Sequence, residues 1–167
     1  MKFRARMDKE SIIITAVVFI IFFFSILIVL NSKKPSVIIS YLIAAFLLIF
    51  VIVLITQKIK YFLVTTDSIQ IVRTFYTIKF PFDKLSAIQS INFDSLEGSF
   101  RRMGINGIFG YSGTFSNSNY GVMRWFLTNK DQIIFLRLTN GENIFLSPEN
   151  AGLFYSTVMD KINIIAV

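Results

Sequence analysis

Residues 133–147 (IIFLRLTNGENIFLS) contain two short apolar runs on either side of Asn140-Gly141. The Asn-Gly pair is the strongest short-range signal for a β-hairpin, because a type I′ turn requires positive φ at both of its central residues. Two antiparallel strands are therefore predicted at residues 133–139 and 143–147.

The spacing of apolar residues changes directly after this hairpin. Ser147-Pro148 supplies an N-cap followed by a proline suited to the first turn of a helix. One face of that helix would then carry Leu153, Phe154, Thr157, Val158 and Ile162. An amphipathic helix that ends near Asn163 is predicted.

Five further stretches upstream have strand character, at residues 60–65, 69–75, 77–82, 87–93 and 122–128. Together with the final hairpin they give seven predicted strands followed by one helix. The predicted fold of residues 58–167 is therefore mainly β. It is a bent antiparallel sheet or barrel of seven strands, capped at its open end by the C-terminal helix.

Several short motifs follow one another in a fixed order through this part of the chain. They are YFLVTTDSI (61–69), FPFDKL (80–85), RRMG (101–104), GYSGTF (110–115), NG (140–141) and LSPE (146–149). In this order they resemble the bacterial pleckstrin-homology (PH)-like domains that follow transmembrane hairpins in small membrane proteins. The resemblance covers roughly residues 60–160 and implies a PH-like fold, with no enzymatic activity and no established ligand.

Residues 12–30 and 37–55 are two strongly hydrophobic stretches, in which 35 of the 38 residues are apolar. At about 1.5 Å per residue each would form a helix roughly 28 Å long, the thickness of a bilayer hydrocarbon core. Both are apolar on every face, unlike the core helices of soluble proteins. A signal peptide is not expected, because the first stretch exceeds the usual core of about 7–15 residues. Transmembrane helices are predicted at residues 12–30 and 37–56, joined by a short loop at 31–36.

Lysine and arginine near the ends of these stretches predict the orientation of the chain. The basic tail at residues 1–11 has four such residues, and the loop has Lys33 and Lys34. Lys58, Lys60 and Arg73 follow the second stretch. This balance predicts a multi-pass protein of the bacterial plasma (inner) membrane with both termini in the cytoplasm.

The composition argues against catalysis, transport and nucleic-acid binding. The chain has no histidine and no cysteine, so it lacks the common catalytic bases, thiol nucleophiles and most zinc ligands. Its carboxylates lie mostly at turns, and apart from Tyr41 no ionisable group lies in the hydrophobic stretches. The net charge of +7 is spread over the tail, the loop and the domain. No enzyme, cofactor, metal site or nucleic-acid partner is expected.

Residues 98–121 hold six of the eight glycines and are predicted to form a long loop between the fourth and fifth strands. No helix and no Lys-Ser/Thr pair follows, so a nucleotide-binding loop is not expected. The loop is either purely structural or a binding site. Within it, Arg101 and Arg102 are candidates for an anionic partner; otherwise they are a solvated pair, or a pair neutralised by Asp94 or Glu97. Tyr111 is a third candidate because tyrosine is enriched at interfaces.

The predicted function is that of a non-catalytic, membrane-anchored module that recruits or scaffolds another protein at the cytoplasmic face. Two alternatives stay open: a sensor of membrane lipid or envelope state that binds an anionic surface, and an accessory subunit that acts through its helical hairpin. Phosphoinositide binding in the usual PH mode is not expected. The turn of the first strand pair, residues 65–68, has one carboxylate and no cation where that mode needs basic residues.

Overall fold

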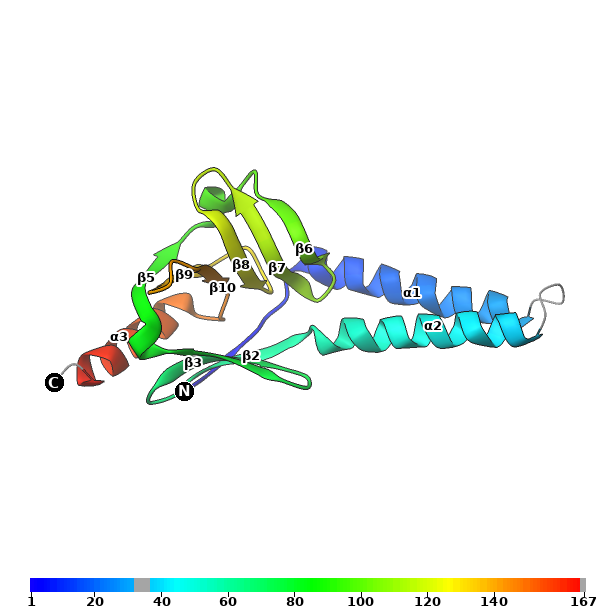
Figure 1. The fold of residues 1–167 in the computed structure, drawn as a ribbon, viewed down its shortest axis with the longest axis horizontal. Helices are drawn as coiled ribbons and strands as arrows, with labels where there is room; N and C mark the ends of the chain where they lie inside the picture. Colours follow the sequence, from blue (N-terminus) through cyan, green and yellow to red (C-terminus); the bar gives the residue numbers. More distant parts are fainter. Residues whose placement is uncertain (32–36, 166–167) are drawn as a thin grey trace.

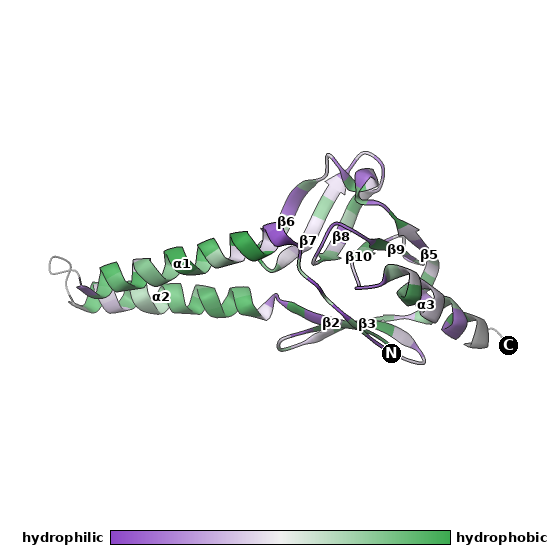
Figure 2. Ribbon diagram, turned by 180° about the vertical axis from the view of Figure 1, so that it is seen from behind, coloured by the Kyte–Doolittle hydropathy of each residue, from purple (hydrophilic) through white to green (hydrophobic). Residues whose placement is uncertain are grey.

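The computed structural model describes residues 1–31 and 37–165, which form a pair of long helices with a sheet-rich domain at one end (Figure 1). Helices α1 (Lys9–Asn31) and α2 (Val37–Thr56) lie side by side, with 5.4 Å between the ring centroids of Phe22 and Phe50. Both are apolar along their length (Figure 2), and both are long enough to cross a membrane. Apart from Asn31, the predicted connecting loop lies outside the described residues.

The domain contains two open sheets. The first has the strand order β1-β2-β3-β4 and consists of β1 (Lys2–Arg4), β2 (Ile59–Val64), β3 (Ser68–Arg73) and β4 (Thr77–Pro81). The second has the order β5-β9-β10-β8-β7-β6 and consists of β5 (Leu85–Ile91), β6 (Phe100–Gly107), β7 (Gly110–Asn117), β8 (Gly121–Leu127), β9 (Ile133–Leu138) and β10 (Asn143–Leu146). All neighbours are antiparallel except β8 and β10. The predicted fold class, a helical hairpin followed by a mainly-β domain with a C-terminal helix, is confirmed.

The predicted loop at residues 98–121 is wrong, because this segment forms the hairpin of β6 and β7 and the start of β8. Within the part of the chain that the structure describes, the domain therefore has nine strands after the helices. Gly104 and Gly113 face each other across the two strands. A Cβ on Gly104 would lie 2.2 Å from the carbonyl oxygen of Ser112. Glycine here permits close strand contact, although in sequence it is more typical of turns.

The predicted basic tail contributes a strand to the domain. Lys2–Arg4 forms β1, which pairs antiparallel with β2 and matches Phe3 with Phe62. The Phe3 side chain is buried and contacts Phe154, with 5.0 Å between ring centroids. Three residues are too few to show a strand period in sequence, which is why the strand is not predicted.

The C-terminal helix α3 (Ala151–Ile165) begins three residues later than predicted. Ser147 does not cap it, because its hydroxyl accepts hydrogen bonds from the backbone N–H groups of Thr128 (2.6 Å) and Asn129 (3.3 Å). Phe154 and Val158 are fully buried, as the helical spacing predicts, whereas Leu153, predicted on the same face, is exposed. They belong to a core that joins β2, β3, β9 and β10 to α3.

The predicted hairpin at Asn140-Gly141 is confirmed as the β9–β10 pair, but its turn is not type I′. Among the described residues Asn140 does not have positive φ, whereas Gly141 does. The N–H of Gly141 donates to the carbonyl oxygen of Leu138 at 2.9 Å. The loop is therefore longer than two residues, with glycine at its left-handed position.

Candidate functional site

The structure separates Tyr111 from the other two residues selected from the sequence, Arg101 and Arg102. Arg101 and Arg102 lie on β6 with exposed side chains, and they donate to Gly104 (3.3 Å) and Ser116 (3.2 Å). Among the described residues neither is paired with Asp94 or Glu97. Tyr111 faces Asn106, five residues further along β6, which is about 17 Å from Arg101.

Tyr111 is 5% exposed and joins the sheet to the start of α1. Its hydroxyl lies 3.1 Å from Asp8 and 3.4 Å from Glu10, and Lys130 forms a 2.8 Å ion pair with Glu10. Burial raises the pKa of Tyr111, and the hydrogen bond with Glu10 raises the pKa of Lys130. These contacts hold α1 against β7. The position of Tyr111 is therefore accounted for by its role in attaching the helix to the sheet.

A cavity of about 460 Å³ lies where α2 meets the two sheets. Its walls include Val53 of α2, Gln57 after it, Arg73 and Ile78 of the first sheet, and Ser112 and Arg124 of the second. No aspartate or glutamate lines it. Its polar lining is therefore either neutral or positively charged.

Arg73 is the residue that gives this cavity its charge. Along β3 the inward-facing positions are Ile69, Ile71 and Arg73, so a cation occupies a place where the strand pattern puts apolar residues. Arg73 is 4% exposed. It donates to the side chains of Gln57 and, at 2.5 Å, Ser112. Its Nε is buried and has no partner among the described residues.

Burial lowers the pKa of Arg73, Tyr76 opposes this shift, and the charge of Arg124 adds the smallest effect, in the lowering direction. A guanidinium nevertheless stays protonated in proteins. Arg73 is thus a buried cation whose identified partners are neutral side chains and aromatic rings.

Arg124 brings a second guanidinium to the same cavity. The guanidinium carbons of Arg73 and Arg124 lie 5.4 Å and 5.2 Å from the ring centroid of Phe126. Glu142 is 3.8 Å from Arg124, and both side chains of this pair are more than 40% exposed, which makes it a weak ion pair. The cavity is therefore lined by two cations and no carboxylate, an arrangement suited to a phosphate or carboxylate group.

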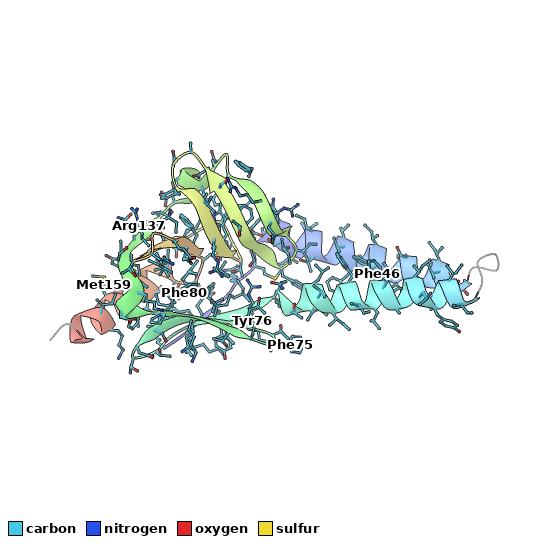
Figure 3. The ribbon with its side chains drawn as sticks, viewed as in Figure 1. Phe46, Phe75, Tyr76, Phe80, Arg137 and Met159 are labelled. Atoms are coloured by element: carbon cyan, nitrogen blue, oxygen red, sulfur yellow. The ribbon has the colours of Figure 1, made fainter. Side chains whose placement is uncertain are left out.

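The cavity lies beside the end of α2 that enters the domain. The Thr74 hydroxyl, in the β3–β4 turn, donates to the carbonyl oxygen of Ile55 at 3.1 Å. Phe75 and Tyr76 of the same turn are 71% and 43% exposed, and Figure 3 shows them next to α2. The exposed aromatic side chains of this turn therefore lie beside the end of α2.

Residues 59–162 match the family model of the bacterial PH domain. The chain belongs to the bacterial PH domain family. Members of this family are generally non-catalytic. No curated protein and no solved structure matches the chain.

In this bacterial PH domain the two ends of β3 differ in charge. At the turn before it, Asp67 accepts hydrogen bonds from Thr65 (2.7 Å) and Ser68 (3.2 Å). The Thr65 bond is the main reason that the pKa of Asp67 is lowered. The other end carries Arg73 and lies beside α2. This site is not predicted from the sequence, although the alternation of Ile69, Ile71 and Arg73 places a cation at an inward-facing position.

No metal centre emerges from the geometry. Within residues 1–31 and 37–165, no group of three or more aspartate, glutamate, histidine or cysteine side chains is arranged to hold a metal ion. The charged side chains that line the Arg73 cavity are both cations, which suit an anion.

Proposed function

We propose that this chain is a membrane-anchored, non-catalytic PH module that binds an anionic group at the membrane surface through the cavity around Arg73. The observation that carries the proposal is the buried guanidinium of Arg73, which faces a cavity without a carboxylate. Removing a cation from water costs several kcal/mol unless an anion or hydrogen bonds compensate for it. A bound phosphate or carboxylate would supply that compensation.

The proposed location is the cytoplasmic leaflet of a bacterial plasma membrane. The hairpin of α1 and α2 is long and apolar enough to span it, and the basic tail favours a cytoplasmic position for both termini. That leaflet has a negative surface potential. A module mounted directly on α2 would hold Arg73 and Arg124 next to anionic headgroups.

The test is binding of inorganic phosphate to the full chain in detergent micelles, measured by calorimetry at low ionic strength. Arg73→Gln is expected to weaken binding by roughly tenfold or more, because a charge-assisted bond contributes about 1.5–3 kcal/mol. Arg137→Gln is the matched control, since Arg137 is exposed and lies away from α1 and α2 (Figure 3). Equal affinity in wild type and Arg73→Gln would refute the proposal.

A second candidate function is recruitment of another protein through β6. This strand lies at the edge of its sheet, and its Phe100 and Met103 side chains are 59% and 75% exposed. Arg101 and Arg102 stand beside them, so the surface suits an acidic partner with apolar residues. Co-purification that is lost in Arg101→Glu/Arg102→Glu, and kept in Arg73→Gln, would favour this candidate.

A further inference from the structure

We infer that the ligand of the Arg73 cavity is a membrane phospholipid that enters sideways from the bilayer, with its phosphate at Arg73 and its acyl chains along α2. This inference depends on the proposed function, because it names the kind of anion that the cavity binds. It also differs from binding at the turn of the first strand pair, since Arg73 lies at the opposite end of β3 from residues 65–67.

The lining of the cavity changes from charged to apolar in the direction of the helix. Arg73, Arg124 and Ser112 lie on the domain side. Val53 lies on the helix side, three residues before the end of α2 and therefore about 4–5 Å further into the apolar stretch. Val53 is half exposed. A free phosphate ion would leave the apolar part of the cavity in contact with water, whereas an amphiphile would fill both parts.

Met103 and Ile105 of β6 add further apolar surface to the lining of the cavity. The Met103 side chain is 75% exposed, and methionine adapts its shape easily to a flexible partner such as an acyl chain. The volume of about 460 Å³ is within the usual range for small-molecule sites. It suits the phosphate and glycerol groups of a phospholipid, while the acyl chains stay in the bilayer.

The β3–β4 and β6–β7 turns attach the domain to the two helices. They therefore set the depth of the cavity relative to the bilayer. The β3–β4 turn is bonded to α2 through Thr74 and exposes Phe75 and Tyr76. The β6–β7 turn contacts α1: Phe109 lies 5.8 Å from Phe19 between ring centroids, and its N–H donates to Thr15 at 2.9 Å. Tyrosine side chains such as that of Tyr76 favour the membrane–water interface. The cavity mouth is therefore expected at the boundary between headgroups and hydrocarbon.

The experiment uses the full chain in lipid nanodiscs of phosphatidylcholine doped with phosphatidylglycerol, read by native mass spectrometry of retained lipid. Inorganic phosphate and glycerol phosphate, which have no acyl chains, are titrated as separate probes. Two variants test the charged and the apolar parts of the cavity separately. Arg73→Gln removes the cation, and Val53→Trp fills the apolar side. Ile49→Trp is the control for the second, because Ile49 is also exposed on α2 and does not line the cavity.

The wild type is expected to retain phosphatidylglycerol roughly tenfold more strongly than phosphatidylcholine, a difference of about 1.4 kcal/mol. Arg73→Gln should lose that preference, and Val53→Trp should lose the lipid while still binding inorganic phosphate. If Arg73→Gln does not fold, Arg124→Gln at the same cavity takes its place.

Two outcomes overturn the inference in different ways. If Val53→Trp keeps phosphatidylglycerol as well as Ile49→Trp does, or glycerol phosphate binds as tightly as the lipid, the site takes a free anion and the proposed function survives. If no probe binds the wild type more tightly than it binds Arg73→Gln, the inference and the proposed function fail together.

Discussion

Arg73 is a buried charge held by neutral side chains, and this is costly for stability. Its guanidinium bonds to Gln57 and Ser112 and lies near the rings of Tyr76 and Phe126. An apolar side chain at this inward-facing position would fit the pattern of Ile69 and Ile71. A residue that weakens the fold and faces a cavity is typical of binding sites, where stability is given up for function.

We therefore predict that Arg73→Met makes the domain more stable, by about 1 kcal/mol, while phosphate binding is lost. Replacing a buried charge with an apolar side chain of similar size is often neutral or stabilising. The measurement is denaturant unfolding in detergent, followed by the fluorescence of Trp125. A loss of more than about 2 kcal/mol would instead make Arg73 a structural residue.

The raised pKa values of Tyr111 and Lys130 predict that the folded protein becomes less stable at high pH. The pKa values of both are raised, Tyr111 by burial and Lys130 chiefly by its hydrogen bond with Glu10. Both groups hold their protons more strongly in the folded state. Their contribution is thus complete below the ordinary values of 10.0 and 10.5 and is lost as pH rises through the folded values.

The measurement for this pair is the free energy of unfolding between about pH 8 and pH 11. The wild type should lose stability more steeply above about pH 10 than Tyr111→Phe/Lys130→Met, which lacks both groups. Parallel curves for the two proteins would contradict the assignment.

Among the strands and helices, the β6–β7 hairpin depends on glycine for close contact between its strands. Gly104 and Gly113 are paired, and a Cβ on either would meet backbone atoms of the other strand at 2.2–2.7 Å. The strands cannot separate locally without breaking the ladder that continues into β8. The close pairing of these two strands thus depends on glycine, although glycine in the interior of a strand usually weakens it.

Gly104→Val is expected to destabilise the domain by about 3 kcal/mol, because the added side chain has no space between the strands. Gly152→Ala in α3 is the control: nothing lies within 4 Å of its added Cβ, and alanine favours a helix by up to about 1 kcal/mol. Thermal unfolding would compare the two. A Gly104→Val protein as stable as the wild type would show that the strands adjust.

The short strand β1 attaches the N-terminus to the domain by pairing with β2, and Phe3 is its buried side chain. Phe3→Ala should cost about 3 kcal/mol, because a buried aromatic ring is removed from the core beside Phe154. Lys2→Ala removes only an exposed side chain that lies over Tyr61 and should cost less than about 1 kcal/mol. Hydrogen exchange of the β2 amides would report whether β1 has detached, and unchanged protection in Phe3→Ala would contradict this role.

For the whole molecule, the pairing of β1 with β2 constrains how the chain lies relative to a membrane. β1 precedes α1 and β2 follows α2, so their pairing places both ends of the helical hairpin at the same domain. Contacts of Tyr111 and Phe109 with α1, and of Thr74 with α2, add to this attachment. The domain is held by both helices and does not hang from one linker.

This arrangement predicts that the N-terminal strand and the domain lie on the same side of the membrane and react with a labelling reagent from that side only. The chain has no cysteine, so single cysteines introduced at Arg4 and Ser118 can be tested with a membrane-impermeant maleimide in intact cells. Both are expected to react only after the membrane is opened, whereas a cysteine at Lys34 should react from outside. Labelling of Arg4→Cys and Ser118→Cys on opposite sides would contradict the fold; labelling of both from outside would reverse the proposed orientation.

Local patterns were enough to predict much of this protein. Uniform apolarity predicts the two helices, alternation predicts most strands, and Asn140-Gly141 locates the β9–β10 hairpin, because each depends on neighbours within a few residues. The missed features depend on residues far apart in the sequence. Met1 bonds to Val64, and Arg73 bonds to Ser112, 39 residues away. Whether Gly104 lies in a loop or a strand, and whether Arg73 faces solvent or a cavity, was decided only when distant strands came together, because burial and pairing are properties of the packed chain.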